Sequence, residues 1–270
     1  MRLGVRSLHL LVFPAFVILA CAAPGKATED PALGARGVPR AGLLQNVTLS
    51  AETDFLSRYV WRGLASSRGF VWQPSVTAST GSFRFSLWGN FPLDHEPNQF
   101  EFNEIDLVLS YNPRIRDFLL TFLLRGELFP NATLASRNYG TPELVTYFRA
   151  AHPLGPVTVA SALATNQVAV GGALYGTFEV SHERRLGSGW ELNTTFLGAY
   201  GNRRFNKTFI TDAGARLHQL QLSLTFPWHA WRGLTISPTI NVSALLPHSF
   251  REAALDPTLV WGGVMVRYDF

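Results

Sequence analysis

From residue 47 onward, short segments of alternating apolar and polar residues are separated by turn-forming residues. Alternation with a period of two is typical of β-strands that have one apolar and one polar face. Twelve segments follow this pattern, at about 47–62, 70–80, 83–92, 102–112, 117–129, 142–151, 157–165, 176–185, 190–200, 215–227, 234–245 and 258–270.

The connections between these segments alternate in length. After the second, fourth, sixth, eighth and tenth segments the chain turns within a few residues. The other connections are mostly longer and span 63–69, 93–101, 130–141, 166–175, 201–214 and 246–257. An even strand number with short turns on one side and long loops on the other is the pattern of bacterial outer-membrane barrels. The sequence therefore predicts an all-β fold, a transmembrane antiparallel β-barrel of about twelve strands with short periplasmic turns and longer extracellular loops.

Composition agrees with a membrane-embedded barrel. Charged residues make up 16% of the chain and aromatic residues 13%, whereas soluble domains contain roughly 25% charged residues. After the first 22 residues, no apolar run approaches the roughly 20 residues of a membrane-spanning helix. Dispersed apolar residues in a membrane protein indicate strands, because only helices and closed barrels satisfy every backbone group in lipid. Without residues 1–22, which hold two arginines and no acidic residue, the net charge falls from +4 to 21 − 19 = +2 and gives no case for nucleic-acid binding.

The first residues resemble an export signal. Arg2 and Arg6 precede an apolar run at 8–19 and small residues at 20–23, as in a secretory signal peptide. We expect a signal peptide at 1–22, a flexible periplasmic linker at 23–46 and the barrel at 47–270. Residues 18–21 also resemble a bacterial lipobox, so lipidation of Cys21 is the alternative to cleavage by signal peptidase I. Cys21 is the single cysteine, which excludes an internal disulfide and a thiolate metal site.

The last segment has the pattern of a closing barrel strand. One parity holds Gly262, Val264, Val266, Tyr268 and Phe270. The residues between Val266 and Phe270 on the other parity, Arg267 and Asp269, are charged. This arrangement resembles the signal that the barrel-assembly machinery recognises during insertion. We therefore expect Tyr268 and Phe270 to act as the assembly signal.

The end of the first segment carries a further pattern, made by Ser57, Tyr59, Trp61, Arg62 and Gly63. This pattern resembles the close of the first strand in the TorF-type porins, a family of bacterial outer-membrane proteins. The pair Gln73-Pro74 and the acidic stretch 103–107 are also similar to that family, and the resemblance covers roughly residues 47–150. The resemblance implies an outer-membrane barrel that acts as a channel, and it does not indicate which substrate passes.

The polar parity of the segments predicts which side chains line the lumen. These pore-lining candidates are Glu52, Asp54, Arg58, Arg62, Asp106, Arg125, Glu127, Arg149, Glu191 and Arg267. The opposite parity, which includes Tyr59 and Trp61, is expected to face lipid. Two interpretations of the lumen stay open: the charges line an aqueous path and set its selectivity, or arginine–carboxylate ladders fill the interior. The strand count does not decide, since barrels of about 8 strands are filled and those of 16–18 are open.

An enzyme is the rival class of function. Acyl hydrolysis needs a serine with an adjacent base that a third group orients. Ser181 and His182 are neighbours in one strand and therefore lie on opposite faces, and the loop pair His248-Ser249 has no placed third partner. The loop sequence 94–96 holds three adjacent ionisable residues, which rarely point at one metal ion. We therefore expect no enzyme activity, no metal and no cofactor.

We expect a porin-like channel in the outer membrane of a Gram-negative bacterium, through which small polar solutes diffuse passively. Its expected partners are outer-membrane lipid and lipopolysaccharide, the barrel-assembly machinery, and the solutes, with no nucleic acid. The alternative is a closed outer-membrane barrel that acts as an adhesion, scaffold or lipid-active protein through its external loops. Five Asn-x-Ser/Thr sequences leave a glycosylated extracellular β-domain as a third possibility.

Overall fold

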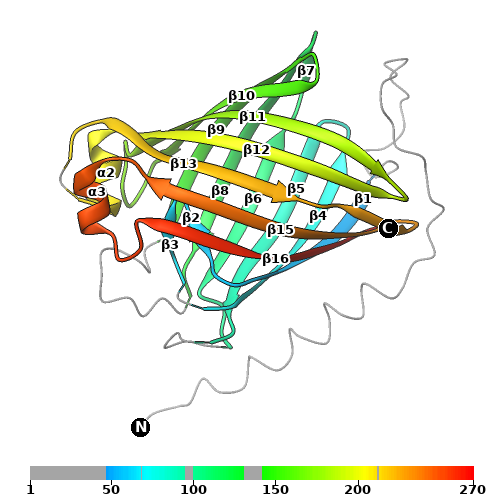
Figure 1. Ribbon diagram of the computed structural model, residues 1–270, viewed down its shortest axis with the longest axis horizontal. Coiled ribbons are helices and arrows are strands. Elements are labelled where there is room, and N and C mark those ends of the chain that lie inside the picture. The colour runs from blue at the N-terminus through cyan, green and yellow to red at the C-terminus, as the bar shows by residue number, and fades with distance from the viewer. Residues whose placement is uncertain (1–46, 68, 95–99, 131–141, 212) are drawn as a thin grey trace.

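The computed structural model describes residues 47–67, 69–94, 100–130, 142–211 and 213–270. In this part of the chain, twelve long antiparallel strands pair in sequence order around a closed barrel (Figure 1). The strands are β1 (Thr48–Leu56), β4 (Val71–Thr80), β5 (Phe83–Pro92), β6 (Glu104–Tyr111), β8 (Phe118–Leu128), β9 (Glu143–Leu154), β10 (Val157–Asn166), β11 (Leu174–Gly187), β12 (Trp190–Gly201), β13 (Arg216–Thr225), β15 (Leu234–Leu245) and β16 (Thr258–Asp269). The predicted fold class is confirmed.

Six shorter elements belong to the connections: β2 (Val60–Trp61), β3 (Leu64–Ala65), β7 (Arg114–Ile115), β14 (Trp228–Trp231), α2 (Arg203–Phe209) and α3 (His248–Ala253). No helix in the described residues has the length and apolar character to span a membrane. The predicted signal peptide, the linker and Cys21 lie outside the described residues.

The outer surface of the barrel is apolar because one parity of each strand points away from the lumen. Leu109, Phe122, Phe178 and Ile240 keep between 45% and 53% of their surface exposed. In a soluble protein such an apolar surface would be unusually large. On a closed barrel it is the surface that meets lipid.

The connections are sorted by length between the two ends of the barrel, as the sequence predicts. The tight turns after β4 and β9 contain Gly81 and Gly155, whose φ angles are +55° and +60°. Glycine adopts such angles without the steric penalty of a side chain. Both helices lie at the opposite end, which we call the long-loop end (Figure 1).

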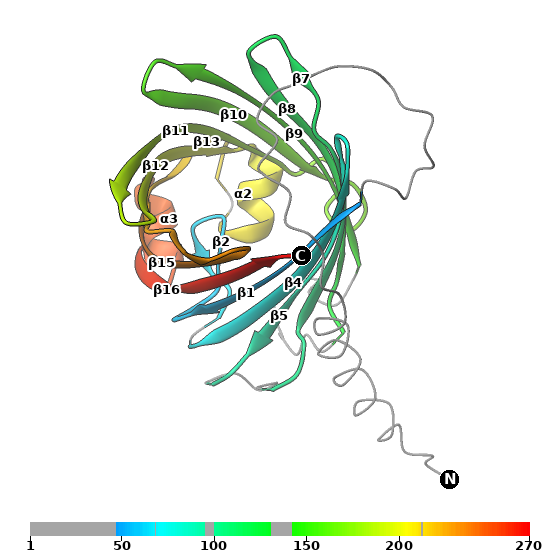
Figure 2. The same ribbon diagram turned by 90° about the vertical axis from the view of Figure 1, so that its right-hand side faces the viewer.

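A cluster of buried apolar residues lies inside the barrel at the long-loop end. They include Tyr175, Phe205, Leu245 and Phe250, and Trp61 and Phe209 pack against them. Viewed from a direction at right angles to Figure 1, α2 and β2 lie within the ring of strands (Figure 2). This apolar core therefore occupies part of the external mouth of the barrel.

The prediction for the first segment is wrong in its last third. We expected one strand over 47–62 with Tyr59 and Trp61 facing lipid, but β1 ends at Leu56. Beyond it the chain turns into the lumen and forms the β2–β3 hairpin. The turn is set by Arg62 and Gly63, which have φ angles of +49° and +77°. Trp61 then finds aromatic partners on α2, which a residue facing lipid would not have.

Candidate functional site

Away from the long-loop end, charged side chains on the lumen face form pairs that remain open to solvent. Arg267 on β16 lies 4.0 Å from Glu52 on β1. Arg149 on β9 lies 3.1 Å from Glu179 on β11. The exposed fractions of these four side chains run from 22% to 46%. Water therefore reaches the charged lumen surface in this part of the barrel.

The connection between β1 and β4 enters the lumen near the long-loop end, and we call its residues 57–67 the strap. The strap begins where Ser57 bonds to β16: its N–H donates to the Gly262 carbonyl oxygen at 2.9 Å. Its return is fixed by Ser67, whose hydroxyl accepts a hydrogen bond from the Tyr59 N–H and donates one to the Gly69 carbonyl. These local bonds satisfy backbone groups that have left the barrel wall.

The strap contacts opposite walls of the barrel. On one side, the hydroxyl of Tyr59 forms a hydrogen bond with Glu104 on β6. On the other side, Nε2 of His218 on β13 donates to the Arg62 carbonyl oxygen at 2.7 Å. Strands β5, β4, β1, β16 and β15 lie between β6 and β13 in the closed order, so these two strands face each other across the lumen. The strap therefore divides the lumen along a diameter.

The tip of the strap is held by aromatic side chains. The Trp61 ring centroid lies 4.9 Å from that of Phe209 and 6.0 Å from that of Phe205. The Arg62 guanidinium carbon lies 4.3 Å, 4.9 Å and 5.4 Å from the ring centroids of Trp61, Tyr175 and Phe205. Attraction to these rings stabilises the cation. Burial, with a smaller contribution from Arg125, lowers the pKa of Arg62 to about 10.

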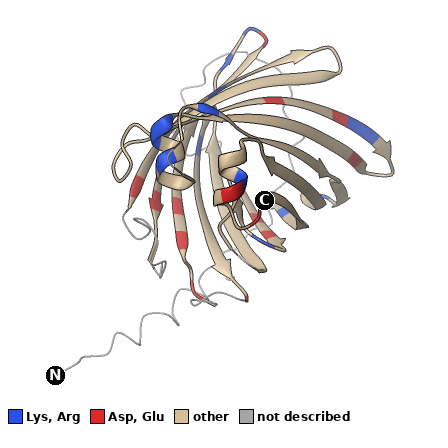
Figure 3. Ribbon diagram, turned by 60° about the vertical axis from the view of Figure 1, so that its left-hand side comes forward, with Lys and Arg blue, Asp and Glu red and all other residues tan. Residues whose placement is uncertain are grey.

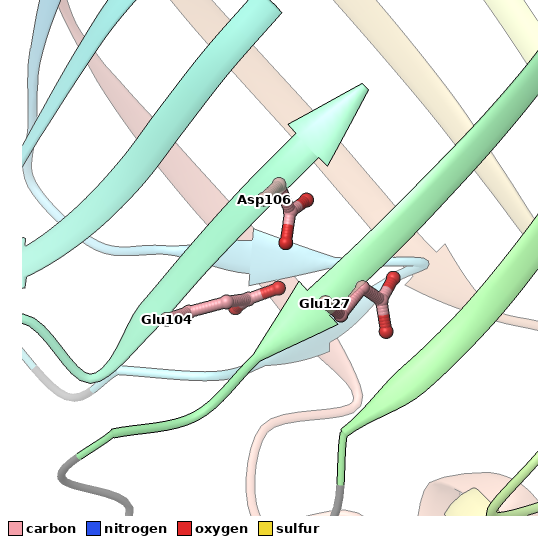
Figure 4. Close-up of side chains that lie close together, drawn as sticks. All are labelled: Glu104, Asp106 and Glu127. Atoms are coloured by element: carbon pink, nitrogen blue, oxygen red, sulfur yellow. The ribbon is translucent and has the colours of Figure 1, made fainter. Parts of the chain in front are cut away.

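Three carboxylates gather on the wall that Tyr59 contacts. Glu104 and Asp106 on β6 and Glu127 on β8 each place an oxygen within 4.8 Å of the others, and we call them the acidic cluster (Figure 4). All three are at most 8% exposed. The register explains the meeting: Asp106 pairs with Glu127, and Glu104 shares a strand face with Asp106. Acidic residues mark neighbouring strands toward the long-loop end in Figure 3.

One arginine accompanies the acidic cluster. Arg125 is two residues from Glu127 on β8, and its Nη2 lies 2.5 Å from a Glu127 carboxylate oxygen. Its Nε lies 3.5 Å from Oδ2 of Asp106. A chain of amides continues this polar layer along the wall: Gln73 donates to Asn90, which donates to Asn103.

The pore-lining candidates fall into two groups. Asp106, Arg125, Glu127 and Arg62 are brought together at the strap and the wall beside it. Arg58 also belongs to the strap, but it pairs with Asp256 after α3 at 3.1 Å. The others lie apart from the strap, and Glu191 among them lies 3.7 Å from Arg185. Of the remainder, Glu52 and Arg149 lie in the pairs described above with Arg267 and Glu179 respectively, and Asp54 follows Glu52 on the same face of β1.

Several residues of this site were missed by the sequence analysis. Glu104 could have been found, since it shares the parity of Asp106. His218 could not, because it lies at an irregularity in the β12–β13 pairing, where Tyr200 pairs with Leu217 and Ala199 with Gln219. As a result, His218 and Gln219 are both buried although they are consecutive.

The residues of the sequence pattern at 57–63 lie close to two residues from later segments. Tyr59, Trp61, Arg62 and Gly63 belong to the strap, and Gln73 and Glu104 belong to the wall beside it. The structure therefore brings separate parts of the sequence pattern together at the strap.

Comparison with solved structures supports the fold. The KdgM porin matches with a TM-score of 0.51 and 12% identity, over 82% of this chain and 99% of the porin. An outer-membrane channel from Pseudomonas putida F1 matches with a TM-score of 0.54 and 9% identity, over 87% of this chain and 100% of the channel. The chain folds as an outer-membrane β-barrel. Its apolar outer surface and closed strand order are those of a barrel that spans an outer membrane. No family model matches the chain, and no curated protein matches it either.

Proposed function

We propose that the barrel is a porin-like channel for passive diffusion of small polar solutes, and that the strap sets its narrowest point. The observation that carries this proposal is the contrast between the two parts of the lumen. Charged pairs such as Arg149–Glu179 are open to solvent. At the long-loop end, the strap spans from Glu104 to His218 across the barrel.

The charges beside the strap would control which solutes pass. Arg62 and Arg125 are positive, whereas the acidic cluster is negative, so both signs line one short stretch of the path. Such rings and pairs of charges set selectivity in channels whose walls are close to the solute. The similarity in fold to a porin and to a channel is consistent with this role, and so is the resemblance of the strap to the TorF-type porins.

The alternative is a closed barrel that acts through its external loops. The packing of Trp61 against α2 favours it, because an apolar core in the mouth reduces the room for water. In that case the charged pairs of the lumen would brace the barrel and no ion would cross.

Insertion by the barrel-assembly machinery remains part of the proposal. Phe270 bonds to the first strand, since its N–H donates to the Leu49 carbonyl oxygen at 3.0 Å. Its ring centroid lies 4.9 Å from that of Tyr268. These two residues thus lie where β16 meets β1.

Single-channel conductance in a planar bilayer tests the channel. We expect discrete conductance steps from the purified protein, and larger steps when residues 58–66 are replaced by a short Gly-Ser turn. The matched control shortens 112–117 at the other end, where β7 pairs with β8, and should leave the step size unchanged.

Folding of each variant is checked first by the shift of its gel band on heating. Equal steps in the wild type and the strap variant would contradict a narrowing by the strap. A folded wild type and a folded strap variant that are both silent would contradict the channel and favour the closed barrel.

A further inference from the structure

We propose that the acidic cluster binds one hard divalent cation of the Ca²⁺ type. Its ligands would be the carboxylates of Glu104, Asp106 and Glu127, on the lumen wall beside the strap. This inference goes beyond the channel proposal, because binding of the ion requires no conduction.

The acidic cluster holds more negative charge than its protein partners compensate. Three carboxylates lie within 4.8 Å of one another and are at most 8% exposed. Within the described residues, Arg125 is the guanidinium in direct contact with them, with distances of 2.5 Å to Glu127 and 3.5 Å to Asp106. Ionised carboxylates away from water are costly unless their charge is compensated. When all three carboxylates are ionised, one arginine shared between two of them leaves the cluster short of positive charge, which a divalent cation would supply.

One carboxylate oxygen of Asp106 has no hydrogen-bond donor within the described residues. The Asp106 side chain is 6% exposed, and within the described residues its Oδ1 receives no hydrogen bond and has almost no accessible surface. Arg125 approaches the other oxygen, Oδ2. A buried carboxylate oxygen normally has a hydrogen-bond donor or a metal ion as its partner. Oδ1 of Asp106 therefore offers a ligand position that the protein itself leaves unused.

The donor set favours Ca²⁺ over softer metals. All three groups supply carboxylate oxygens, which suit hard cations. Ca²⁺ accepts six to eight oxygens in variable geometry, whereas Mg²⁺ demands a near-ideal octahedron. The cluster is built across two strands with fixed register, Asp106 against Glu127. Water from the lumen would complete the coordination.

The aromatic rings beside the acidic cluster allow a bound ion to be detected by luminescence. Tyr59 forms a hydrogen bond with Glu104, and its ring centroid lies 5.8 Å from that of Trp88. Tb³⁺ replaces Ca²⁺ at oxygen sites and emits when a nearby aromatic ring is excited. We expect Tb³⁺ luminescence from the full-length protein in detergent after treatment with EDTA, and its loss when Ca²⁺ is added.

The test compares Asp106→Asn with Glu179→Gln. Both changes remove one lumen carboxylate charge, but Glu179 pairs with Arg149 away from the cluster. Calorimetric titration with CaCl₂ should show one site fewer, or a site weaker by about tenfold or more, in Asp106→Asn. Glu179→Gln should bind as the wild type does. Because lipopolysaccharide that copurifies contributes equally to all samples, the difference between variants reports the cluster.

Equal Ca²⁺ uptake by the wild type and Asp106→Asn would overturn the proposal, and so would Tb³⁺ emission that Asp106→Asn leaves intact. Displacement of Tb³⁺ by Na⁺ at the same concentration as Ca²⁺ would overturn the assignment to a divalent ion. If Asp106→Asn lacks the heat-shifted gel band, Glu104→Gln replaces it in the same comparison. A protein that binds Ca²⁺ but does not conduct would fail as a channel and keep the cation site.

Discussion

At the scale of single residues, Gly63 decides whether the strap can lie across the lumen. Its φ angle of +77° favours glycine, and a Cβ built there would overlap the Gln219 side chain on β13. Gly81 has a similar φ angle of +55° in a short turn, where nothing lies within 4 Å of such a Cβ. The two glycines therefore share a conformational requirement and differ in the space around them.

We expect Gly63→Ala to displace the strap and Gly81→Ala to leave it in place. Each change costs on the order of 1 kcal/mol for the left-handed conformation, but only Gly63→Ala adds the overlap with Gln219. The measurement is the rate at which trypsin cuts after Arg62 in the folded barrel. Similar cleavage rates in the two variants would mean that contact with Gln219 does not hold the strap.

The residue types and their alternation predict which charged side chains face the lumen, but they do not predict which of these side chains contact one another. Alternation places Asp106 and Arg125 inward, because a strand has a period of two. It cannot say that Glu104, Asp106 and Glu127 meet, since their meeting depends on the register between β6 and β8.

At the scale of elements, α2 stabilises the aromatic core against which the strap packs. Its N-cap is Asn202, whose Oδ1 accepts hydrogen bonds from the N–H groups of Phe205 at 2.8 Å and Leu174 at 3.1 Å. Its Nδ2 donates to the Gly172 carbonyl oxygen at 2.9 Å. One side chain thus joins the helix to β11 and to the connection before it.

We expect Asn202→Ala to loosen α2 and Asn202→Asp to preserve it. Alanine loses the cap, which is worth about 1 kcal/mol, so amide hydrogens of 203–209 should exchange about fivefold faster. Aspartate keeps both acceptor contacts and loses the bond to Gly172. Hydrogen exchange followed by mass spectrometry makes the comparison, and protection that survives in Asn202→Ala would show that packing of Phe205 alone holds the helix.

Elements whose two faces have different surroundings were predicted well. The bounds of β5 and β15 agree with the predicted 83–92 and 234–245. The strap was not predicted, because residues 57–62 continue the alternation of β1 while facing no lipid. Its apolar side chain Trp61 packs against Phe205 and Phe209, which belong to α2, a helix far along the chain. Local pattern cannot distinguish these aromatic partners from lipid.

At the scale of the whole molecule, two adjacent glycines allow the barrel to close where the strap leaves the wall. Leu56 pairs with Gly263, after which the Ser57 N–H bonds to the Gly262 carbonyl oxygen. A Cβ at Gly263 would overlap the Phe55 carbonyl oxygen and lie 2.9 Å from the Leu56 Cα. The first and last strands thus approach more closely here than a side chain permits.

Gly263→Ala should therefore impair closure of the barrel, whereas Gly126→Ala on β8 should not. Nothing lies within 4 Å of a Cβ at Gly126, and alanine is a better strand residue than glycine by roughly 0.5–1 kcal/mol. The fraction of protein whose gel band shifts on heating measures closure. A normal fraction in Gly263→Ala would mean that β1 and β16 shift enough to accept the methyl group.

The span of the strap also has a consequence for the order of folding. Arg62 and its hydrogen-bond partner His218 are 156 positions apart in the chain, and contacts between distant positions form late because a long loop must close first. The strap is made early in synthesis, yet its anchor on β13 exists only when most of the wall is complete. The barrel wall would then close first, and the strap would cross the lumen last. The lumen would therefore be widest just before the native state is reached.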